Sequence, residues 1–260
     1  LIKAWEWSSN DRITCVLPLH HVHGIINVVG CSLWSGATCY FTAGFSPKLI
    51  FELIEQDKLN VFMAVPTIYY KLIAYIETLA MAEQNSLREC MKKFRLMVCG
   101  SAALPVSVME KWAQMSGHQL LERYGMTETN MNTSNPYEGT RRAGTVGMPL
   151  PGIELKITDA ASGETLPAGE IGQIEVRGPN VFKGYWQMPE KTAAELRETG
   201  FFITGDLGRI DEDGYLHIVG RNKDLIISGG YNIYPKEIEL VLDDQIGVLE
   251  SAVIGVPDPD

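Results

Sequence analysis

The 260-residue sequence is poor in cysteine, and its cysteines do not follow a metal-binding or disulfide pattern. There are five, with no C-x-x-C pair among them. An odd number without paired spacing argues against both a disulfide-rich scaffold and a zinc site, and it favours a reducing compartment.

Positive charge and long apolar runs are also scarce. Lys and Arg number 22 against 32 Asp and Glu, which gives a formal net charge of −10. This balance argues against a nucleic-acid partner, although a local cationic pocket for an acidic small molecule is compatible with it. No run reaches the roughly 18 apolar residues that span a bilayer, so we expect no membrane partner. The oligomeric state is left open.

The ends of the chain lack familiar signals. Leu1 is not methionine, and no basic leader with an apolar segment follows it. The apolar run 251–255 leads directly into the last residues. We therefore expect an internal fragment of a longer cytoplasmic protein; a mitochondrial matrix location fits equally if that protein is eukaryotic.

What is present indicates one large globular domain or two ordinary ones. Apolar residues make up 45% and charged residues 21%, with 25 Gly and 13 Pro. These proportions argue against disorder and against a fibrous chain.

The first 120 residues alternate short apolar runs with amphipathic helical patterns. Buried strands are predicted at 13–17 and 37–41, and further strands at 61–65 and 94–98. Helices are predicted after Pro47, with Ser46 as N-cap, after Pro66 and after Pro105. Such alternation predicts a parallel sheet covered by helices.

The pattern changes near residue 140. Short, glycine-punctuated runs over 152–219 predict a β-rich subdomain, with a hairpin turn at 211–214. The charged segment 221–224 then marks a boundary, and 225–242 reads as a strand, a glycine turn and a helix.

The segment 121–129 carries the most chemistry. Tyr124 and Gly125 permit a tight turn at a strand end, where open α/β sheets bind ligands. Thr127 offers a hydroxyl to a phosphate oxygen, and Glu128 offers a hard ligand to Mg²⁺. Taken alone, the segment also fits a polar loop with a capping threonine.

Other motifs surround this segment in a fixed order. They are Leu17–Gly24, Gly100–Leu104, Gly147–Gly152, Gly184–Trp186, Thr204–Asp206, Gly220–Asp224 and Ser228–Pro235. The ordered series resembles the adenylate-forming acyl-CoA synthetase superfamily of AMP-binding enzymes over essentially the whole chain. The resemblance implies the adenylate-forming α/β fold: a parallel sheet with helices, a β-rich subdomain and the start of a small α+β domain. It also implies that 1–220 belongs to the large adenylation domain, 221–224 is a hinge and 225–260 begins the mobile C-terminal domain.

The amino-acid sequences of 122–135 and 178–186 are similar to those of malonyl-CoA synthetases. Arg123 stands where many monocarboxylate-using relatives have a small or apolar residue. A guanidinium can hold the second carboxylate of a dicarboxylic acid such as malonate or methylmalonate with two charge-assisted hydrogen bonds. The alternative is a structural arginine paired with a nearby carboxylate such as Glu122.

The resemblance implies ATP, Mg²⁺ and coenzyme A as reactants, with an acyl-adenylate as intermediate. Thr127 would contact the α-phosphate and Glu128 would hold Mg²⁺. The nucleotide would be bound by Gly100, Ser101, Ala102, Tyr124, Gly125, Asp206 and Arg221. Asp206 would accept hydrogen bonds from both ribose hydroxyls, with a turn-forming aspartate as the alternative.

Three histidines, His20, His21 and His23, lie within four residues and also raise a metal hypothesis. In a strand, His21 and His23 would share one face. By resemblance His21 lies near the α-phosphate and the reacting carboxylate, and His23 and Met126 flank the acid.

The remaining assignments concern the boundary and the segment C-terminal to it. Lys223 and Asp224 would form the hinge, with an ordinary charged linker as the alternative. Ser228, Gly229 and Gly230 would approach coenzyme A, where glycine permits close contact, or would form only a tight turn.

Two departures from the family pattern stand out. The phosphate-binding loop expected before Leu1 and the adenylation lysine expected after Asp260 are not in the chain, so we expect the 260 residues alone to form no acyl-adenylate. Cys99 replaces a usual serine and is a poorer hydrogen-bond donor. Two alternatives stay open: a monocarboxylate acyl-CoA synthetase and a non-catalytic nucleotide-binding module.

Overall fold

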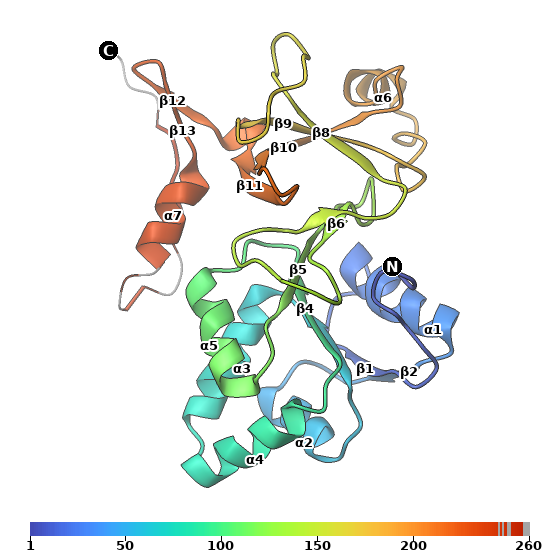
Figure 1. Ribbon diagram of the computed structural model, residues 1–260, viewed down its shortest axis with the longest axis vertical. Helices are drawn as coiled ribbons and strands as arrows, with labels where there is room; N and C mark the ends of the chain where they lie inside the picture. Colours follow the sequence, from blue (N-terminus) through green and yellow to red (C-terminus); the bar gives the residue numbers. More distant parts are fainter. Residues whose placement is uncertain (244, 246, 249–250, 257–260) are drawn as a thin grey trace. The chain divides into compact units, whose positions relative to one another are not determined.

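The computed structural model describes residues 1–243, 245, 247–248 and 251–256 (Figure 1). The chain divides into two compact units, Leu1–Pro151 and Gly152–Asp260. The division lies close to the change of pattern in the sequence.

The first unit is built on a five-stranded sheet in the order β3-β4-β5-β6-β7. The strands β3 (Val61–Ala64), β4 (Leu96–Gly100) and β5 (Leu121–Tyr124) pair in parallel. The short strands β6 (Thr133–Ser134) and β7 (Met148–Pro149) extend the sheet in antiparallel fashion. The predicted parallel sheet is confirmed, with β4 starting two residues later than expected.

Four helices accompany this sheet: α2 (Pro47–Glu55), α3 (Pro66–Glu77), α4 (Met81–Met91) and α5 (Val106–Ser116). Tyr69 on α3 packs edge-on against Trp112 on α5 at 5.0 Å between ring centroids. The Tyr69 hydroxyl also donates to the Val98 carbonyl of β4 at 2.9 Å, which joins α3 to the sheet. Pro47 and Pro66 begin their helices as predicted, but the Ser46 side chain makes no capping hydrogen bond.

A separate parallel pair is formed by β1 (Arg12–Cys15) and β2 (Thr38–Phe41). The expectation that 37–41 is buried was wrong, because Phe41 is 62% exposed and, among the described residues, β2 pairs only with β1. Between the two strands lie a π-helix, η1 (His23–Gly30), and a short helix, α1 (Cys31–Ser35).

The second unit contains an antiparallel sheet in the order β11-β10-β9-β8. Its strands are β8 (Glu154–Thr158), β9 (Gly172–Arg177), β10 (Phe202–Ile210) and β11 (Leu216–Arg221). The helix α6 (Pro189–Glu195) precedes β10. The predicted hairpin turn joins β10 to β11, where the Asp211 carboxylate accepts the backbone N–H groups of Asp213 and Tyr215.

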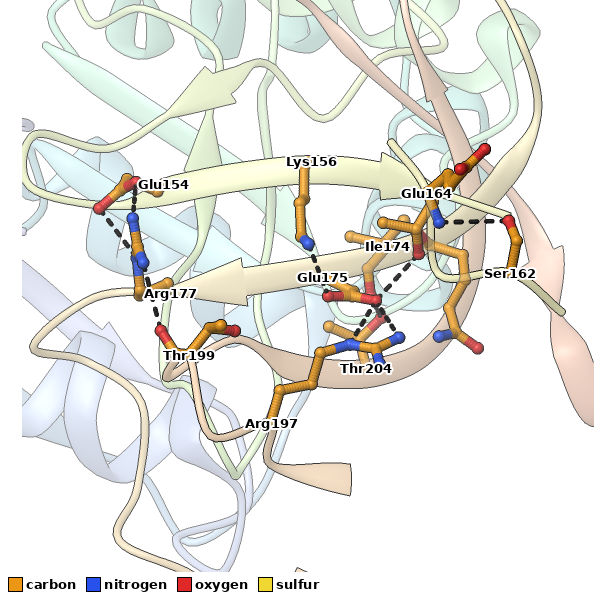
Figure 2. Close-up of polar contacts among 12 residues, drawn as sticks. Glu154, Lys156, Ser162, Glu164, Ile174, Glu175, Arg177, Arg197, Thr199 and Thr204 are labelled. Atoms are coloured by element: carbon orange, nitrogen blue, oxygen red, sulfur yellow. Dashed lines mark hydrogen bonds and ion pairs between the residues drawn. The ribbon is translucent and has the colours of Figure 1, made fainter. Parts of the chain in front are cut away.

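Glu175 forms the polar centre of this sheet (Figure 2). Its side chain is fully buried and accepts hydrogen bonds from Arg197 at 2.6 and 2.9 Å and from the Thr158 hydroxyl at 2.9 Å. Lys156 adds an ion pair at 3.3 Å. Burial acts to raise the pKa of Glu175, but these donors outweigh it and lower the pKa, so the carboxylate stays ionised.

The chain after β11 forms a short 3₁₀ helix, η2 (Asn222–Asp224), and a hairpin of β12 (Ile226–Ser228) and β13 (Tyr231–Ile233), followed by α7 (Pro235–Asp243). The strand, glycine turn and helix predicted for 225–242 are therefore present. The second hairpin strand, β13, was not anticipated.

Candidate active site

The carboxyl ends of β4 and β5 bring two motif loops to the same edge of the sheet. Gly100 at the end of β4 pairs with Arg123 on β5, and Ser101 follows with a left-handed backbone, φ +72°. A Cβ on Gly100 would meet Arg123 Nε at 2.7 Å. A side chain at position 100 would therefore displace the guanidinium, which lies against the Gly100 backbone.

Arg123 is a buried cation without a carboxylate partner among the described residues. Its side chain is 3% exposed, Nη2 donates to Ser101 Oγ at 3.3 Å, and Nε is buried with no hydrogen-bond partner. Burial lowers its pKa to about 10, so the group remains charged at neutral pH. Isolated buried charges are costly.

Glu122 does not neutralise Arg123, although it is adjacent in sequence. Consecutive residues of a strand point to opposite faces, and Glu122 pairs in register with Cys99. Burial raises the pKa of Glu122 to about 8, against the opposing hydrogen bond from the Gly144 amide. The alternative of a structural Arg123–Glu122 pair is therefore wrong.

Cys99 shares its strand face with Glu122. The thiol is fully buried, and burial followed by the nearby Glu122 raises its pKa. It therefore stays protonated.

His23 completes a chain of polar contacts with Arg123. His23 Nδ1 lies 3.2 Å from Ser101 Oγ, so the serine hydroxyl contacts both residues. The ring is 2% exposed, and burial, with a smaller contribution from the Arg123 charge, lowers its pKa to about 2. His23 is therefore neutral. Its Nε2 is buried and has no partner.

The other two histidines lie outside any strand. His20 and His21 lie exposed in a turn, and His23 begins the π-helix η1, so the arrangement that a strand would give these three side chains does not apply. Gly24 explains the turn, since a Cβ there would lie 2.5 Å from the Pro18 carbonyl. No group of three metal-ligating side chains occurs in the described part of the chain.

The loop after β5 presents the central motif. Gly125 packs against the Asn130 carbonyl with no room for a side chain. The loop closes through the Thr129 amide, which donates to the Met126 carbonyl at 3.2 Å. Thr127 is exposed and Glu128 half-buried in this turn, at the end of β5 where nucleotide ligands bind in open sheets.

The second unit carries the other predicted residues. Asp206 on β10 pairs in register with Arg221 on β11, and Arg221 Nε lies 3.6 Å from Asp206 Oδ1. Lys223 and Asp224 are exposed in η2.

The predicted coenzyme A residues lie on the β12–β13 hairpin. Gly229 and Gly230 form its turn with φ of +57° and +81°, and with Ser228 they are exposed. The glycine turn predicted there is thus present.

The part of the chain that the structure describes contains no helix long and apolar enough to cross a membrane.

Comparison with known proteins agrees with this geometry. Residues 1–186 match the model of the AMP-binding enzyme family. The chain is 44% identical over 284 residues to the mitochondrial malonate–CoA ligase ACSF3 of Bos taurus, covering 99% of this chain and 48% of the relative. The chain thus spans about half the length of the relatives it matches.

Solved structures show the same relationship. The ATP-bound MatB from Rhodopseudomonas palustris is 48% identical with a TM-score of 0.91, over 100% of this chain and 50% of that one. A malonyl-CoA ligase in a ternary complex with methylmalonyl-CoA and AMP is 42% identical with a TM-score of 0.77, over 100% and 55%. The predicted adenylate-forming fold is confirmed, and the chain belongs to the AMP-binding enzyme family.

Proposed function

We propose that the full-length enzyme, meaning this chain together with the regions its relatives carry beyond the matched half, is an ATP-dependent acid–thiol ligase that forms malonyl-CoA and also accepts methylmalonate. The observation that carries the proposal is Arg123, a buried cation with no carboxylate partner among the described residues. The second carboxylate of malonate supplies the missing charge.

The reaction has two displacements. One malonate carboxylate oxygen attacks the α-phosphorus of ATP, and pyrophosphate leaves. The sulfur of coenzyme A then attacks the acyl carbon, loses its proton and displaces AMP. Thr127 donates its hydroxyl to an α-phosphate oxygen, and the exposed His21 lies beside the α-phosphate and the reacting carboxylate.

Glu128 is suited to bind the Mg²⁺ ion that adenylation uses. A carboxylate beside a hydroxyl in one turn is a hard oxygen donor set of the kind Mg²⁺ prefers. The ion, when bound, offsets the negative charge of the phosphates.

The acid pocket is formed by Arg123, Ser101, His23 and Met126. Ser101 contacts both Arg123 and His23 and so orients two side chains toward one ligand. Because His23 is neutral, the net positive charge of the pocket comes from Arg123 alone. One cation matches one free carboxylate.

The remaining roles follow the family pattern. Gly100, Ala102, Tyr124 and Gly125 border adenine. Asp206 and Arg221 bind the ribose.

The mobile parts follow the same pattern. Lys223 and Asp224 act as hinge between an adenylation domain ending at 220 and a C-terminal domain beginning at 225, and residues 228–230 approach coenzyme A. We assign the enzyme to the cytoplasm, or to the mitochondrial matrix in a eukaryote.

Arg123 also argues against a monocarboxylate acyl-CoA synthetase. An uncompensated buried cation in an apolar acyl tunnel costs several kcal/mol. In a non-catalytic nucleotide-binding module no acid substrate would neutralise the buried charge of Arg123.

The test is malonate-dependent pyrophosphate release by the full-length enzyme, compared with acetate and propionate. We expect a preference for malonate of at least about 100-fold in kcat/KM, the equivalent of roughly 3 kcal/mol. No turnover of any acid supports the non-catalytic alternative, and a preference for propionate supports the monocarboxylate alternative.

A variant of Glu128 tests the magnesium role. Glu128→Gln keeps the shape of the side chain and removes its charge. Adenylation should fall strongly, whereas thioester formation from pre-made malonyl-adenylate should fall much less. Equal loss in both half-reactions would mean that Glu128 is structural.

A further inference from the structure

Asp206 is the last residue of a bulge in β10. On β10, Ile203 pairs with Glu175 and Leu207 pairs with Gln173 of β9. Three residues of β10, Thr204 to Asp206, therefore face the single residue Ile174. Gly205 lies at the middle of the bulge with φ +76°, a conformation that glycine adopts without strain.

Such a bulge leaves backbone groups without their usual partners in the sheet. The Thr204 hydroxyl satisfies two of them, because it donates to the Ile174 carbonyl at 2.9 Å and accepts the Asp206 N–H at 3.1 Å. The Thr204 side chain is buried, so water does not readily replace these bonds. One hydroxyl thus connects the bulge to β9.

The bulge fixes the position from which Asp206 projects. Its amide is held by Thr204 on one side, while in the ladder to β11 the residue pairs with Arg221. The Asp206 side chain is 14% exposed, and Arg221, at 63%, is much more open. The carboxylate is therefore held from the backbone side, and its direction depends on the shape of the bulge.

We propose that Thr204 is a positioning residue for nucleotide binding, whose hydroxyl holds the bulge in the shape that aims Asp206 at the two ribose hydroxyls. This inference rests on the proposed function only through the assignment of the ribose to Asp206. It does not depend on which acid the enzyme uses.

The test measures the equilibrium binding of AMP and of 2′,3′-dideoxy-AMP to the full-length enzyme by calorimetry. Thr204→Val keeps the branched shape and removes both hydrogen bonds. We expect its Kd for AMP to rise about tenfold, the order of one or two lost hydrogen bonds. Its Kd for 2′,3′-dideoxy-AMP should change less than about twofold, because that ligand lacks the hydroxyls that Asp206 binds. Thr204→Ser, which retains the oxygen, should bind AMP within about twofold of wild type.

Thr158→Val is the matched control. Thr158 is also a buried threonine of this sheet, but its hydroxyl bonds within the β8–β9 ladder, to Glu175 and to the Gln173 carbonyl. It should lower the thermal stability without separating the two nucleotides.

The outcomes are distinct. An equal loss of both ligands in Thr204→Val, or no loss of either, overturns the inference, as does a wild-type enzyme that binds both nucleotides equally. Because nucleotide binding needs no acid, a failure to activate malonate would overturn the proposed substrate and leave this result standing.

Discussion

Two buried ionised side chains, one in each unit, differ in how the chain satisfies them. Glu175 in the second unit is fully buried and forms ion pairs with Arg197 and Lys156 (Figure 2). It also accepts a hydrogen bond from the Thr158 hydroxyl. Arg123 in the first unit is nearly as buried but makes one hydrogen bond, of 3.3 Å, to Ser101.

The difference separates a charge that stabilises the fold from one that serves a ligand. A buried ion whose partners all come from the chain is part of the folded structure, and removing it leaves those partners uncompensated. A buried ion without an opposite charge lowers the stability of the folded state until a ligand supplies one. Glu122, on the other face of β5, shows a third solution, in which the acid keeps its proton.

The largest expected effect is on the pH dependence of stability, and it comes from Glu122. Since burial raises the Glu122 pKa from 4.5 to about 8, the folded chain holds a proton that the unfolded chain releases within this interval. Stability therefore falls as pH rises, by about 1.4 kcal/mol per pH unit relative to Glu122→Gln, or roughly 4 kcal/mol between pH 5 and 8.

The measurement is urea unfolding of the 260-residue chain, followed by the fluorescence of buried Trp5 and Trp112. Because the pKa of His23 lies far below its ordinary value of 6.5, the fold also loses stability as the pH falls below 6.5. Wild type and Glu122→Gln share this effect. Parallel stability curves for wild type and Glu122→Gln would mean that Glu122 is ionised in the fold.

The next largest effect on stability should come from replacing Glu175, whose charge is balanced by partners within the chain. Glu175→Gln should lower the free energy of local opening of β8 and β9 by about 3 kcal/mol. That is the low end for a broken buried pair, because Arg197 and Lys156 are partly exposed and can be hydrated. Hydrogen exchange of peptides from these strands measures it. Glu154→Gln is the control on the same sheet: it breaks an exposed pair with Arg177 and should cost less than about 1 kcal/mol. Equal losses would remove the distinction between the two carboxylates.

The smallest effect should come from the unsatisfied charge. Arg123→Met replaces a buried cation without a carboxylate partner by an apolar side chain, so stability should stay within about 1 kcal/mol of wild type or rise. Arg95→Met is the matched variant in the same unit, because Arg95 donates twice to the buried Asp11 at 2.6 Å. It should cost about 3 kcal/mol. Comparable losses in the two variants would make Arg123 a structural residue.

The parallel sheet could be predicted because β3 and most of β4 are continuous apolar runs. The strand β5 follows no such pattern: all four residues of Leu121–Tyr124 are buried, although Glu122 and Arg123 have ionisable side chains. The motif after β5 identified the loop and the family, but not the burial of Arg123. Burial depends on neighbouring strands, and a local pattern does not contain them.

Two local conformations also could not be predicted from the sequence pattern. The sequence did not predict the conformation of His20 to His23, where Gly24 lets the chain turn against Pro18 and enter a π-helix. Thr204 was not predicted as a site residue, although it stands in the same motif as Asp206. Its role depends on the register between β9 and β10, which only the folded sheet specifies.

The central claim is that Arg123 binds the second carboxylate of the substrate. The most direct measurement compares kcat/KM for malonate and for propionate in wild-type and Arg123→Ala full-length enzyme. Breaking a buried charge pair costs on the order of 3–5 kcal/mol, which corresponds to a loss of roughly a hundred- to several-thousand-fold on malonate. Propionate has no second carboxylate, so its kcat/KM should stay level or rise. A parallel fall for both acids would contradict the account.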